Sequence, residues 1–318
     1  MSSAEVRVGS VSLRGPVMTA SGTAGHSTEL SPYLDVSALG AVVIKSLSAA
    51  PWPGNPAPRL HPAGVGMINA VGLQGPGVAA WLDHGLPALL ATGATVVASI
   101  WGRSVDDYRA AAEAMAAAPA GGGAVEVNLS CPNLEGRRGI FAHDPALSAE
   151  VVAATAGCGR PRWAKLSPNT DRIVEVAAAV HEAGAEAVTL VNTLLGMVLD
   201  PDSGRPSLAA GGGGYSGRGI HPVAVRAVFD THAAHPTLPI VGVGGVASGW
   251  DAAELMLAGA SAVQVGTATF ADPGTPLRVQ RELLEWCERR GLALAELVGL
   301  AHRGGLPGGG LHRGGPAR

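Results

Sequence analysis

A run of polar and reactive side chains follows a short apolar segment near the middle of the chain. Asn128-Leu-Ser-Cys-Pro-Asn133 presents two amides, a hydroxyl and a thiol directly after a predicted strand at residues 124–127. Amides donate and accept hydrogen bonds, as a planar ligand rich in carbonyl groups requires, and a thiol can exchange a proton near neutral pH. The alternative interpretation is a turn in which Cys131 is a buried structural residue, because free cysteine usually packs as a small hydrophobe. The paired asparagines favour a binding or catalytic loop.

Two lysines stand at the ends of other apolar segments. Lys45 follows residues 41–44, and Lys165 follows residues 162–164. Because lysine is seldom buried without a partner, a lysine at the mouth of a cavity indicates an anionic ligand or cofactor. A salt bridge to a neighbouring carboxylate is the alternative for either residue. Their occurrence together with Asn128 and Asn192 favours the ligand.

Glycine-rich segments follow the last two apolar runs. They read Val241-Gly-Val-Gly-Gly-Val-Ala-Ser248 and Val265-Gly-Thr-Ala268. Barrel proteins commonly bind phosphate after strands seven and eight, through backbone N–H groups and a helix N-terminus. Glycine also serves tight turns, so either segment alone is weak evidence. Together with the lysines and amides, the two segments predict a phosphorylated cofactor that faces a small polar substrate.

The apolar segments that carry these residues alternate with amphipathic or alanine-rich segments, as in repeated β/α units. Eight strands are predicted, at residues 16–19, 41–44, 95–98, 124–127, 162–164, 187–190, 239–243 and 262–265. Helices are predicted at residues 77–90, 105–117, 146–155, 171–183, 222–233, 249–258 and 276–290. Each strand ends in polar or glycine residues, which is where a (β/α)8 barrel builds its active site. We therefore predict an α/β fold of the TIM-barrel type. A doubly wound open sheet is the alternative, but Ser21-Gly-Thr-Ala-Gly25 lacks the spacing of a nucleotide-binding turn.

Two long segments interrupt this rhythm. Residues 48–77 follow the second strand, and residues 198–217 follow the sixth. Long insertions at the C-terminal face of a barrel usually shape or cover the site, so we expect these to do so. We further expect one barrel domain over residues 1–302 and a disordered tail, rich in glycine, proline and arginine, over residues 303–318.

Composition narrows the class of protein. The chain has 318 residues, which is ordinary for a single α/β barrel, and its formal net charge of -3 gives no basic footprint for nucleic acid. Cys131, Cys158 and Cys287 are widely separated and lack metal-ligand spacing, which is typical of a reduced, cytoplasmic protein. No apolar run reaches the ~18 residues of a membrane span. We predict a cytoplasmic protein with no metal site and no nucleic-acid or membrane partner.

These motifs resemble those of the class 1 dihydroorotate dehydrogenases, which are FMN enzymes of pyrimidine biosynthesis. The resemblance runs from Gly15 to about Pro273. It is carried by Asn128-Leu-Ser-Cys-Pro-Asn133, Ala20-Ser-Gly-Thr23, Ile44-Lys-Ser46, Gly54-Asn-Pro-Ala-Pro-Arg59, Met67-Ile-Asn-Ala-Val-Gly-Leu-Gln74, Lys165-Leu-Ser-Pro-Asn169, Asn192-Thr-Leu-Leu-Gly-Met197 and Gly259-Ala-Ser-Ala-Val-Gln-Val-Gly-Thr267. A cysteine rather than a serine in the first motif indicates class 1, and the segments around Asn69 and Asn192 are most similar to class 1B. Members of that class pair with an iron–sulfur flavoprotein that passes electrons to NAD.

The resemblance implies a reaction and a role for each matching residue. The reaction is the oxidation of (S)-dihydroorotate to orotate. Cys131 would be the base that removes the C5 proton while hydride leaves C6 for N5 of FMN. Lys45 would lie between flavin and substrate as a second catalytic residue, and Lys165 would stabilise the reduced anionic flavin at its N1–C2 edge.

Contacts with both ligands are implied in the same way. The implied substrate contacts are Lys45, Asn69, Ala70, Val71, Gly72, Leu73, Asn128, Asn133, Asn192 and Thr193. The implied FMN contacts are Ser21, Lys45, Ser46, Ser99, Asn128, Lys165, Val191, Gly217, Gly244, Gly245, Gly266 and Thr267. The implied assembly is a homodimer of barrels, or a heterotetramer that includes two iron–sulfur FAD subunits for electron transfer.

The sequence also departs from the family pattern. Ser99 stands where the family usually has an asparagine near the flavin, and Tyr215 and Arg218-Gly-Ile-His221 differ from the usual run. Arg137-Arg138 is an unusual pair in the loop after Asn133. Three other functions stay open at this stage. They are a flavoenzyme similar to dihydropyrimidine dehydrogenase, a barrel lyase with Lys165 as Schiff-base nucleophile, and a non-enzymatic binder of a phosphorylated ligand.

Overall fold

The computed structural model describes residues 4–119, 123–130 and 141–306. Eight parallel strands form one sheet in the spatial order β3-β14-β13-β10-β9-β8-β7-β4. They are β3 (Val17–Thr19), β4 (Val42–Val43), β7 (Val96–Ile100), β8 (Val125–Asn128), β9 (Arg162–Lys165), β10 (Ala187–Leu190), β13 (Ile240–Val243) and β14 (Ala262–Val265). A parallel bridge between Met18 and Ala41 joins the two ends of this sheet. The predicted (β/α)8 barrel is therefore confirmed.

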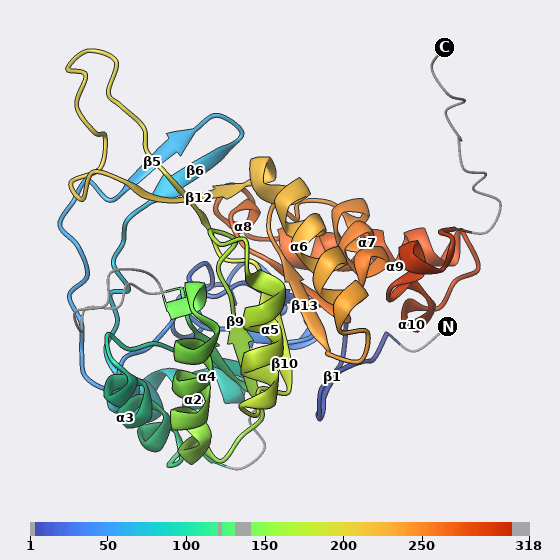
Figure 1. Cartoon of the computed structure of the whole chain (residues 1–318), viewed down its shortest axis with the longest axis horizontal. Coiled ribbons are helices and arrows are strands. Elements are labelled where there is room, and N and C mark those ends of the chain that lie inside the picture. Colours follow the sequence, from blue (N-terminus) through green and yellow to red (C-terminus); the bar gives the residue numbers. More distant parts are fainter. Residues whose placement is uncertain (1–3, 120–122, 131–140, 307–318) are drawn as a thin grey trace.

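Helices surround the barrel and connect its strands (Figure 1). Six of them fall where apolar periodicity predicts them, namely α3 (Val105–Met115), α4 (Pro145–Ala154), α5 (Ile173–Glu182), α6 (His221–Ala234), α7 (Gly249–Ala258) and α9 (Thr275–Glu288). Their starts have local causes. Ser104, for example, accepts a hydrogen bond from the backbone N–H of Asp107 (3.0 Å) and caps α3. The shorter helices are α8 (Ala268–Ala271) and α10 (Leu294–Leu297).

The helix predicted at residues 77–90 is present, but it is not α-helical throughout. It consists of α1 (Val78–Ala80), a wider π-type turn at Trp81–Gly85 and α2 (Leu86–Ala91). Trp81 is buried and its indole N–H donates to the carbonyl of His26 (2.7 Å). The glycine at position 85 leaves room for the Trp81 ring, because a Cβ there would meet the indole. The π-type turn thus accommodates the buried side chain of Trp81.

A short N-terminal hairpin closes the lower end of the barrel. Its strands are β1 (Val6–Val8) and β2 (Val11–Leu13), which pair antiparallel. Val8 and Leu13 are fully buried against a cluster that fills the barrel interior. The barrel residues of that cluster are Met18, Ala41, Val43, Val97, Ala124, Trp163, Ala187, Val241 and Ala262. The apolar packing lies at the starts of the strands, so polar residues at their C-terminal ends face the other opening.

A second, four-stranded antiparallel sheet covers that opening. It has the order β11-β12-β6-β5 and is built from β5 (Leu60–Ala63), β6 (Gly66–Asn69), β11 (Leu194–Gly196) and β12 (Gly213–Gly217). Its labelled strands β5, β6 and β12 lie together at one side of the molecule, with the segment between β11 and β12 projecting beyond them (Figure 1). This insertion sheet joins the two segments that interrupt the β/α rhythm, and Tyr215 pairs with Ile68 across it.

The C-terminal part packs against the barrel as far as the structure describes it. Arg303 ends a short turn at Leu300–Arg303 and donates to the carbonyl of Val298 (2.9 Å), and Leu306 packs against the core. The remainder of the predicted tail, residues 307–318, lies outside the described residues. Among the described helices, none combines the length and apolar character that a bilayer crossing needs.

Candidate active site

A cavity of about 1400 Å³ opens between the C-terminal ends of the barrel strands and the insertion sheet. It brings together most of the residues singled out from the sequence. Those that line it are Ser21, Lys45, Ser46, Asn69, Ala70, Val71, Gly72, Leu73, Asn128, Lys165, Val191, Asn192, Thr193, Gly217, Gly244, Gly245, Gly266 and Thr267. Cys131 and Asn133 lie outside the described residues, but Ser130, which precedes Cys131, lines the cavity.

A hydrogen-bond network fixes the two central asparagines. The side-chain amide of Asn128, at the end of β8, donates to the hydroxyl of Ser46 (3.1 Å). Its carbonyl oxygen accepts from the amide of Asn192 (3.3 Å) and from the backbone N–H of Ser130 (3.2 Å). Behind β8, the phenol of Tyr108 donates to the Asn128 backbone carbonyl (2.6 Å). These contacts hold the amides in one orientation, as a site that recognises a planar ligand requires.

Ser99 is the one described residue of the predicted set that does not line the cavity. It is fully buried in β7, and its hydroxyl lies 2.8 Å from that of Ser46. Ser46 lies in turn 3.2 Å from the hydroxyl of Ser21, which does line the cavity. The serine side chain is too short to extend past Ser46. Ser99 is therefore connected to the cavity only indirectly, through the hydroxyl groups of Ser46 and Ser21. A direct contact with a cofactor stays a prediction.

The two lysines have different surroundings. Lys165 is almost fully buried, and its ammonium nitrogen lies 3.7 Å from Oε1 of Glu126. Lys45 is half-buried and makes no ion pair with any carboxylate in the part of the chain that the structure describes. Burial lowers the pKa of Lys45, and the nearby guanidinium of Arg59 lowers it further. The salt-bridge interpretation therefore holds for Lys165, whereas Lys45 is available to an anionic ligand.

His26 is a neighbour of Lys45 that the sequence did not single out. Its Nε2 is buried without a hydrogen-bond partner among the described residues. Burial lowers the pKa of His26, the charge of Lys45 lowers it further, and Glu29 opposes the shift. His26 is therefore less readily protonated than a free histidine, which limits the positive charge that it adds beside Lys45.

Glycines shape another part of the cavity wall. Gly217, Gly244 and Gly245 have φ values of 107°, 140° and 70°, which side chains rarely adopt. A Cβ on Gly244 would lie 2.7 Å from the Cβ of Ala224, and one on Gly245 would lie 2.7 Å from the Cβ of His221. Only glycine fits this turn, so backbone rather than side chain forms this part of the cavity wall. Such a wall suits an anion such as phosphate.

Two residues that depart from the family pattern, Arg218 and His221, lie at this glycine wall, whereas Arg137-Arg138 lies outside the described residues. Arg218 lines the cavity, and His221 is buried beneath the glycine turn. His221 Nδ1 lies 2.7 Å from the carbonyl of Gly244, and its Nε2 lies 3.1 Å from Glu254. The histidine thus ties the turn to α7 through a hydrogen bond at each ring nitrogen.

The insertion side presents backbone as well as side chains. Asn69, at the end of β6, donates to the carbonyl of Gly214 (3.2 Å). Beyond it, residues 70–73 are held by Asn55, whose amide donates to Ala70 (2.9 Å), and by Trp52, whose indole donates to Gly72 (3.0 Å). Leu73 adopts a positive φ of 60°, which is uncommon for a bulky residue and recurs at functional loops.

Asn169 is a further cavity residue, and the quoted Lys165–Asn169 motif contains it without assigning it a role. Its amide nitrogen donates to the hydroxyl of Ser167 (2.9 Å) and to the carbonyl of Thr193 (2.9 Å). Its oxygen accepts from the backbone N–H of Leu195 (2.8 Å), in β11. Asn169 therefore joins the barrel to the insertion sheet. The sequence signal that could have identified Asn169 is a polar residue next to a proline, shortly after the end of a strand.

Among the described residues, no three His, Cys, Asp or Glu side chains are grouped so that they could hold a metal ion. The arrangement instead offers amides, one unpaired ammonium, one paired ammonium and a glycine turn. These groups can bind a planar polar molecule beside a phosphorylated one.

Comparison with known proteins agrees with this arrangement. The family model described as dihydroorotate dehydrogenase matches residues 3–286. A protein from Trichlorobacter lovleyi named dihydroorotate dehydrogenase B (NAD(+)), catalytic subunit, is 43% identical over 296 residues, which cover 92% of this chain and 97% of the relative. A protein of the same name from Desulforudis audaxviator is 44% identical over 302 residues, with 94% and 98% covered. A relative from Solibacter usitatus with the provisional name dihydroorotate dehydrogenase A (fumarate) is 44% identical over 291 residues, with 91% and 95% covered.

Both the family match and the relatives thus extend over nearly the whole barrel, including the strands and insertions that line the cavity. The chain belongs to the dihydroorotate dehydrogenase family.

Proposed function

We propose that this chain is the FMN-binding catalytic subunit of a class 1B dihydroorotate dehydrogenase, which oxidises (S)-dihydroorotate to orotate in pyrimidine biosynthesis. The observation that carries the proposal is the joint presence, in one cavity, of the Asn128–Asn192 network, the unpaired Lys45 and the glycine turn at Gly244 and Gly245. The amides and the ammonium match a pyrimidine ring with a carboxylate. The turn matches a phosphate.

The residues present fit FMN. The cavity of about 1400 Å³ exceeds the ~300–1,000 Å³ of a pocket for one drug-sized ligand, so it has room for a flavin and a small substrate. Backbone N–H groups around Gly217, Gly244, Gly245, Gly266 and Thr267 would hold the phosphate, and Ser21, Ser46, Val191 and Lys165 would contact the rest. FMN, when bound, supplies an acceptor for the hydride that leaves C6 of the substrate.

The chain's own groups would bind the substrate and take its proton. Asn69, Asn128, Asn192 and Thr193 would hold the ring, together with Asn133, which lies outside the described residues. Lys45 would pair with the carboxylate. Cys131 would accept the proton from C5, so that loss of this proton and of hydride from C6 leaves the C5–C6 double bond of orotate. The position of Ser130 in the cavity wall, one residue before Cys131, supports this role.

Electrons must leave the flavin through a partner protein or an external acceptor. The chain has three cysteines, fewer than the four that usually hold an iron–sulfur cluster, and no dinucleotide-binding fingerprint. The names of several relatives include NAD(+) and the term catalytic subunit. We therefore propose an iron–sulfur FAD partner, in an assembly built on a homodimer of barrels.

A dihydropyrimidine without a carboxylate, such as dihydrouracil, is the second candidate substrate. The unpaired ammonium of Lys45 favours dihydroorotate, because a neutral ring would leave that half-buried charge without a partner. A lyase with Lys165 as Schiff-base nucleophile is disfavoured, because Glu126 already pairs with the ammonium of Lys165.

Spectroscopy of the purified chain tests the proposal. We expect a yellow protein with one FMN per chain. Under anaerobic conditions, dihydroorotate should bleach the flavin, whereas dihydrouracil should not. A colourless protein that rebinds no FMN, or faster bleaching by dihydrouracil, would contradict the proposal.

Addition of electron acceptors tests the class. After bleaching, an artificial dye should restore the colour of the isolated chain, and NAD should do so slowly until an iron–sulfur FAD protein is added. Rapid reoxidation by NAD with the isolated chain would exclude the class 1B assignment. Rapid reoxidation by fumarate would indicate class 1A instead.

A further inference from the structure

A carboxylate is buried inside the barrel, directly below the cavity. Glu126 is fully buried in the middle of β8. Successive side chains of a strand point to opposite faces, so Ala124, Glu126 and Asn128 share the interior face. Ala124 belongs to the apolar cluster of the barrel interior, and Asn128 lines the cavity. Glu126 thus occupies the layer between the packed core and the site.

The two oxygens of Glu126 have different surroundings. Oε2 accepts hydrogen bonds from the amide of Gln264 on β14 (2.9 Å) and from the hydroxyl of Thr189 on β10 (3.1 Å). Oε1 has no hydrogen-bond partner among the described residues and lies 3.7 Å from the ammonium of Lys165. One oxygen is therefore anchored by two strands, and the other faces the lysine at the end of β9.

A buried carboxylate needs a reason to be there. Burial of a charge is strongly unfavourable unless the charge is paired and hydrogen-bonded, and an apolar residue of similar volume often serves stability as well. Glu126 itself, with Gln264 and Thr189 that hydrogen-bond to it, comes from three different strands, and together these residues form the contact with Lys165. Packing alone does not require that arrangement, whereas control of the Lys165 charge does.

From this geometry we infer that Glu126 is a positioning residue for Lys165, one that fixes the ammonium at the cavity wall and offsets part of its charge. The inference rests on the proposed function, because the charge of Lys165 matters most if a flavin lies against it. A lone ammonium would stabilise reduced flavin strongly and hinder its reoxidation. The Glu126–Lys165 pair moderates that effect and sets the flavin midpoint potential between the two extremes.

The central experiment compares midpoint potentials in FMN-loaded protein. Glu126→Gln keeps the size of the side chain, and Gln264 can reverse its amide so that its unpartnered oxygen accepts from the new amide. We expect the potential to rise, with the reduced flavin stabilised roughly tenfold, which is about 30 mV for a two-electron couple. In a Lys165→Met background, the same substitution should change the potential little.

A matched control is Glu285→Gln, which changes a carboxylate to an amide on the outer surface of α9. Glu285 is half-exposed and faces Arg281 and Arg289 at 3.9 Å. Its substitution should leave the potential unchanged. An unchanged or lower potential in Glu126→Gln, or an equal shift with and without Lys165, would overturn the inference.

A second readout does not need the flavin and remains usable if Glu126→Gln binds FMN poorly. In thermal unfolding of the FMN-free protein, Glu126→Gln should lower the midpoint, because it leaves a buried ammonium unpaired. Glu126→Gln/Lys165→Met should unfold at a higher temperature than Glu126→Gln alone. Equal or additive losses would mean that Glu126 is only a packing residue. If the protein never binds FMN, the proposed function fails, whereas this unfolding comparison still decides the charge pair.

Discussion

The barrel side and the insertion side of the cavity are built in different ways. On the barrel side, functional groups lie at strand ends and are held by hydrogen bonds between side chains. Asn128, for example, is hydrogen-bonded to Ser46 and to Asn192. On the insertion side, Asn55 and Trp52 hold the backbone of residues 70–73. Exposure differs as much: Lys165 is 4% exposed, whereas Leu195 in β11 is 66% exposed.

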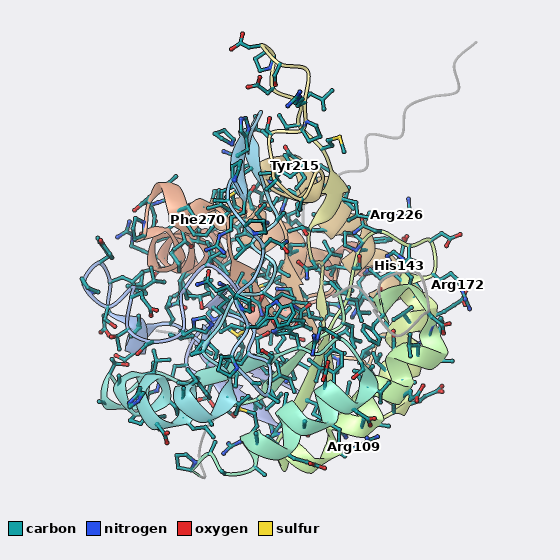
Figure 2. The ribbon with its side chains drawn as sticks, turned by 90° about the vertical axis from the view of Figure 1, so that its left-hand side faces the viewer. Arg109, His143, Arg172, Tyr215, Arg226 and Phe270 are labelled. Atoms are coloured by element: carbon teal, nitrogen blue, oxygen red, sulfur yellow. The ribbon has the colours of Figure 1, made fainter. Side chains whose placement is uncertain are left out.

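This difference indicates a division of roles. The barrel side is buried and hydrogen-bonded, which suits groups whose charge and position set the chemistry. The insertion side is more exposed, which suits the entry and recognition of substrate. Figure 2 shows Tyr215 on the insertion side and Phe270 on α8. Arg109 on α3, Arg226 on α6 and Arg172, just before α5, do not line the cavity. Substitutions on the two sides should therefore alter different measured quantities.

The largest effect is expected at Cys131, which follows β8 in sequence and lies outside the described residues. Cys131→Ala should keep FMN but lose about 10²–10⁴-fold in turnover, because a positioned base is removed. Cys131→Ser should retain some activity, chiefly at high pH, since a hydroxyl is a far weaker acid than a thiol with an ordinary pKa of about 8.5. Stopped-flow measurement of flavin reduction by dihydroorotate checks this. An unchanged rate in Cys131→Ala would remove the residue from the mechanism.

Lys45→Met should separate recognition from stability on the barrel side. Loss of a charge-assisted hydrogen bond of ~1.5–3 kcal/mol should weaken dihydroorotate binding about ten- to a hundredfold. The pKa of Lys45 is lowered in the folded state, so the unfolded chain binds the proton more tightly and stability rises as pH increases through the lowered pKa. Lys45→Met should remove that rise and increase the unfolding temperature of the ligand-free protein at neutral pH.

The control for Lys45→Met is Arg226→Met, because Arg226 is 77% exposed on α6 and lies outside the cavity. It should change neither binding nor the pH dependence. Unfolding of Lys45→Met at a lower temperature than the unmodified protein would show that Lys45 has a stabilising partner.

Lys165→Ala tests whether the barrel side sets the redox property. Without the ammonium, reduced flavin should be less stable. The equilibrium constant for flavin reduction should fall about tenfold, which lowers the midpoint potential by ~30 mV for a two-electron couple. Spectroelectrochemical titration measures this shift. An equal or higher potential would argue that Lys165 does not contact the flavin.

The smallest effect is expected on the insertion side, from Trp52→Phe. The aromatic ring can still pack at 5.9 Å from Trp101 and under Arg103, but the hydrogen bond to Gly72 is lost. One neutral hydrogen bond is worth about 1 kcal/mol, so KM should rise roughly fivefold. The flavin potential should stay the same. A shifted potential with an unchanged KM would mean that the two sides are not separable.

The two sides also differ in how far the sequence predicts them. All eight barrel strands lie within predicted segments or differ from them by one or two residues, because a buried parallel strand is a short apolar run. Polar residues directly after those runs must meet at one end of a barrel, so Lys45, Asn128, Lys165 and Asn192 could be grouped in advance.

The insertion sheet could not be predicted in this way. β6 and β12 are separated by more than a hundred residues in sequence, and β12 is glycine-rich with little apolar alternation. Their pairing depends on the barrel that brings their ends together. The π-type turn at Trp81–Gly85 depends similarly on a tertiary contact with His26. The position of Glu126 could have been predicted from the sequence, since the alternation of side chains along a strand places it on the same face as Asn128.

The closed lower end of the barrel has a kinetic consequence. Val8 and Leu13 fill the end opposite the cavity, so dihydroorotate, orotate and the electron acceptor must reach the described site from the same side. If substrate and acceptor compete for this approach, orotate leaves before reoxidation begins, and initial-rate plots at several acceptor concentrations are parallel lines. If the acceptor instead takes electrons at a separate edge while orotate is still bound, the lines intersect. The N-terminal hairpin, far from any reacting atom, thereby makes the order of orotate release and flavin reoxidation a property that kinetics can measure.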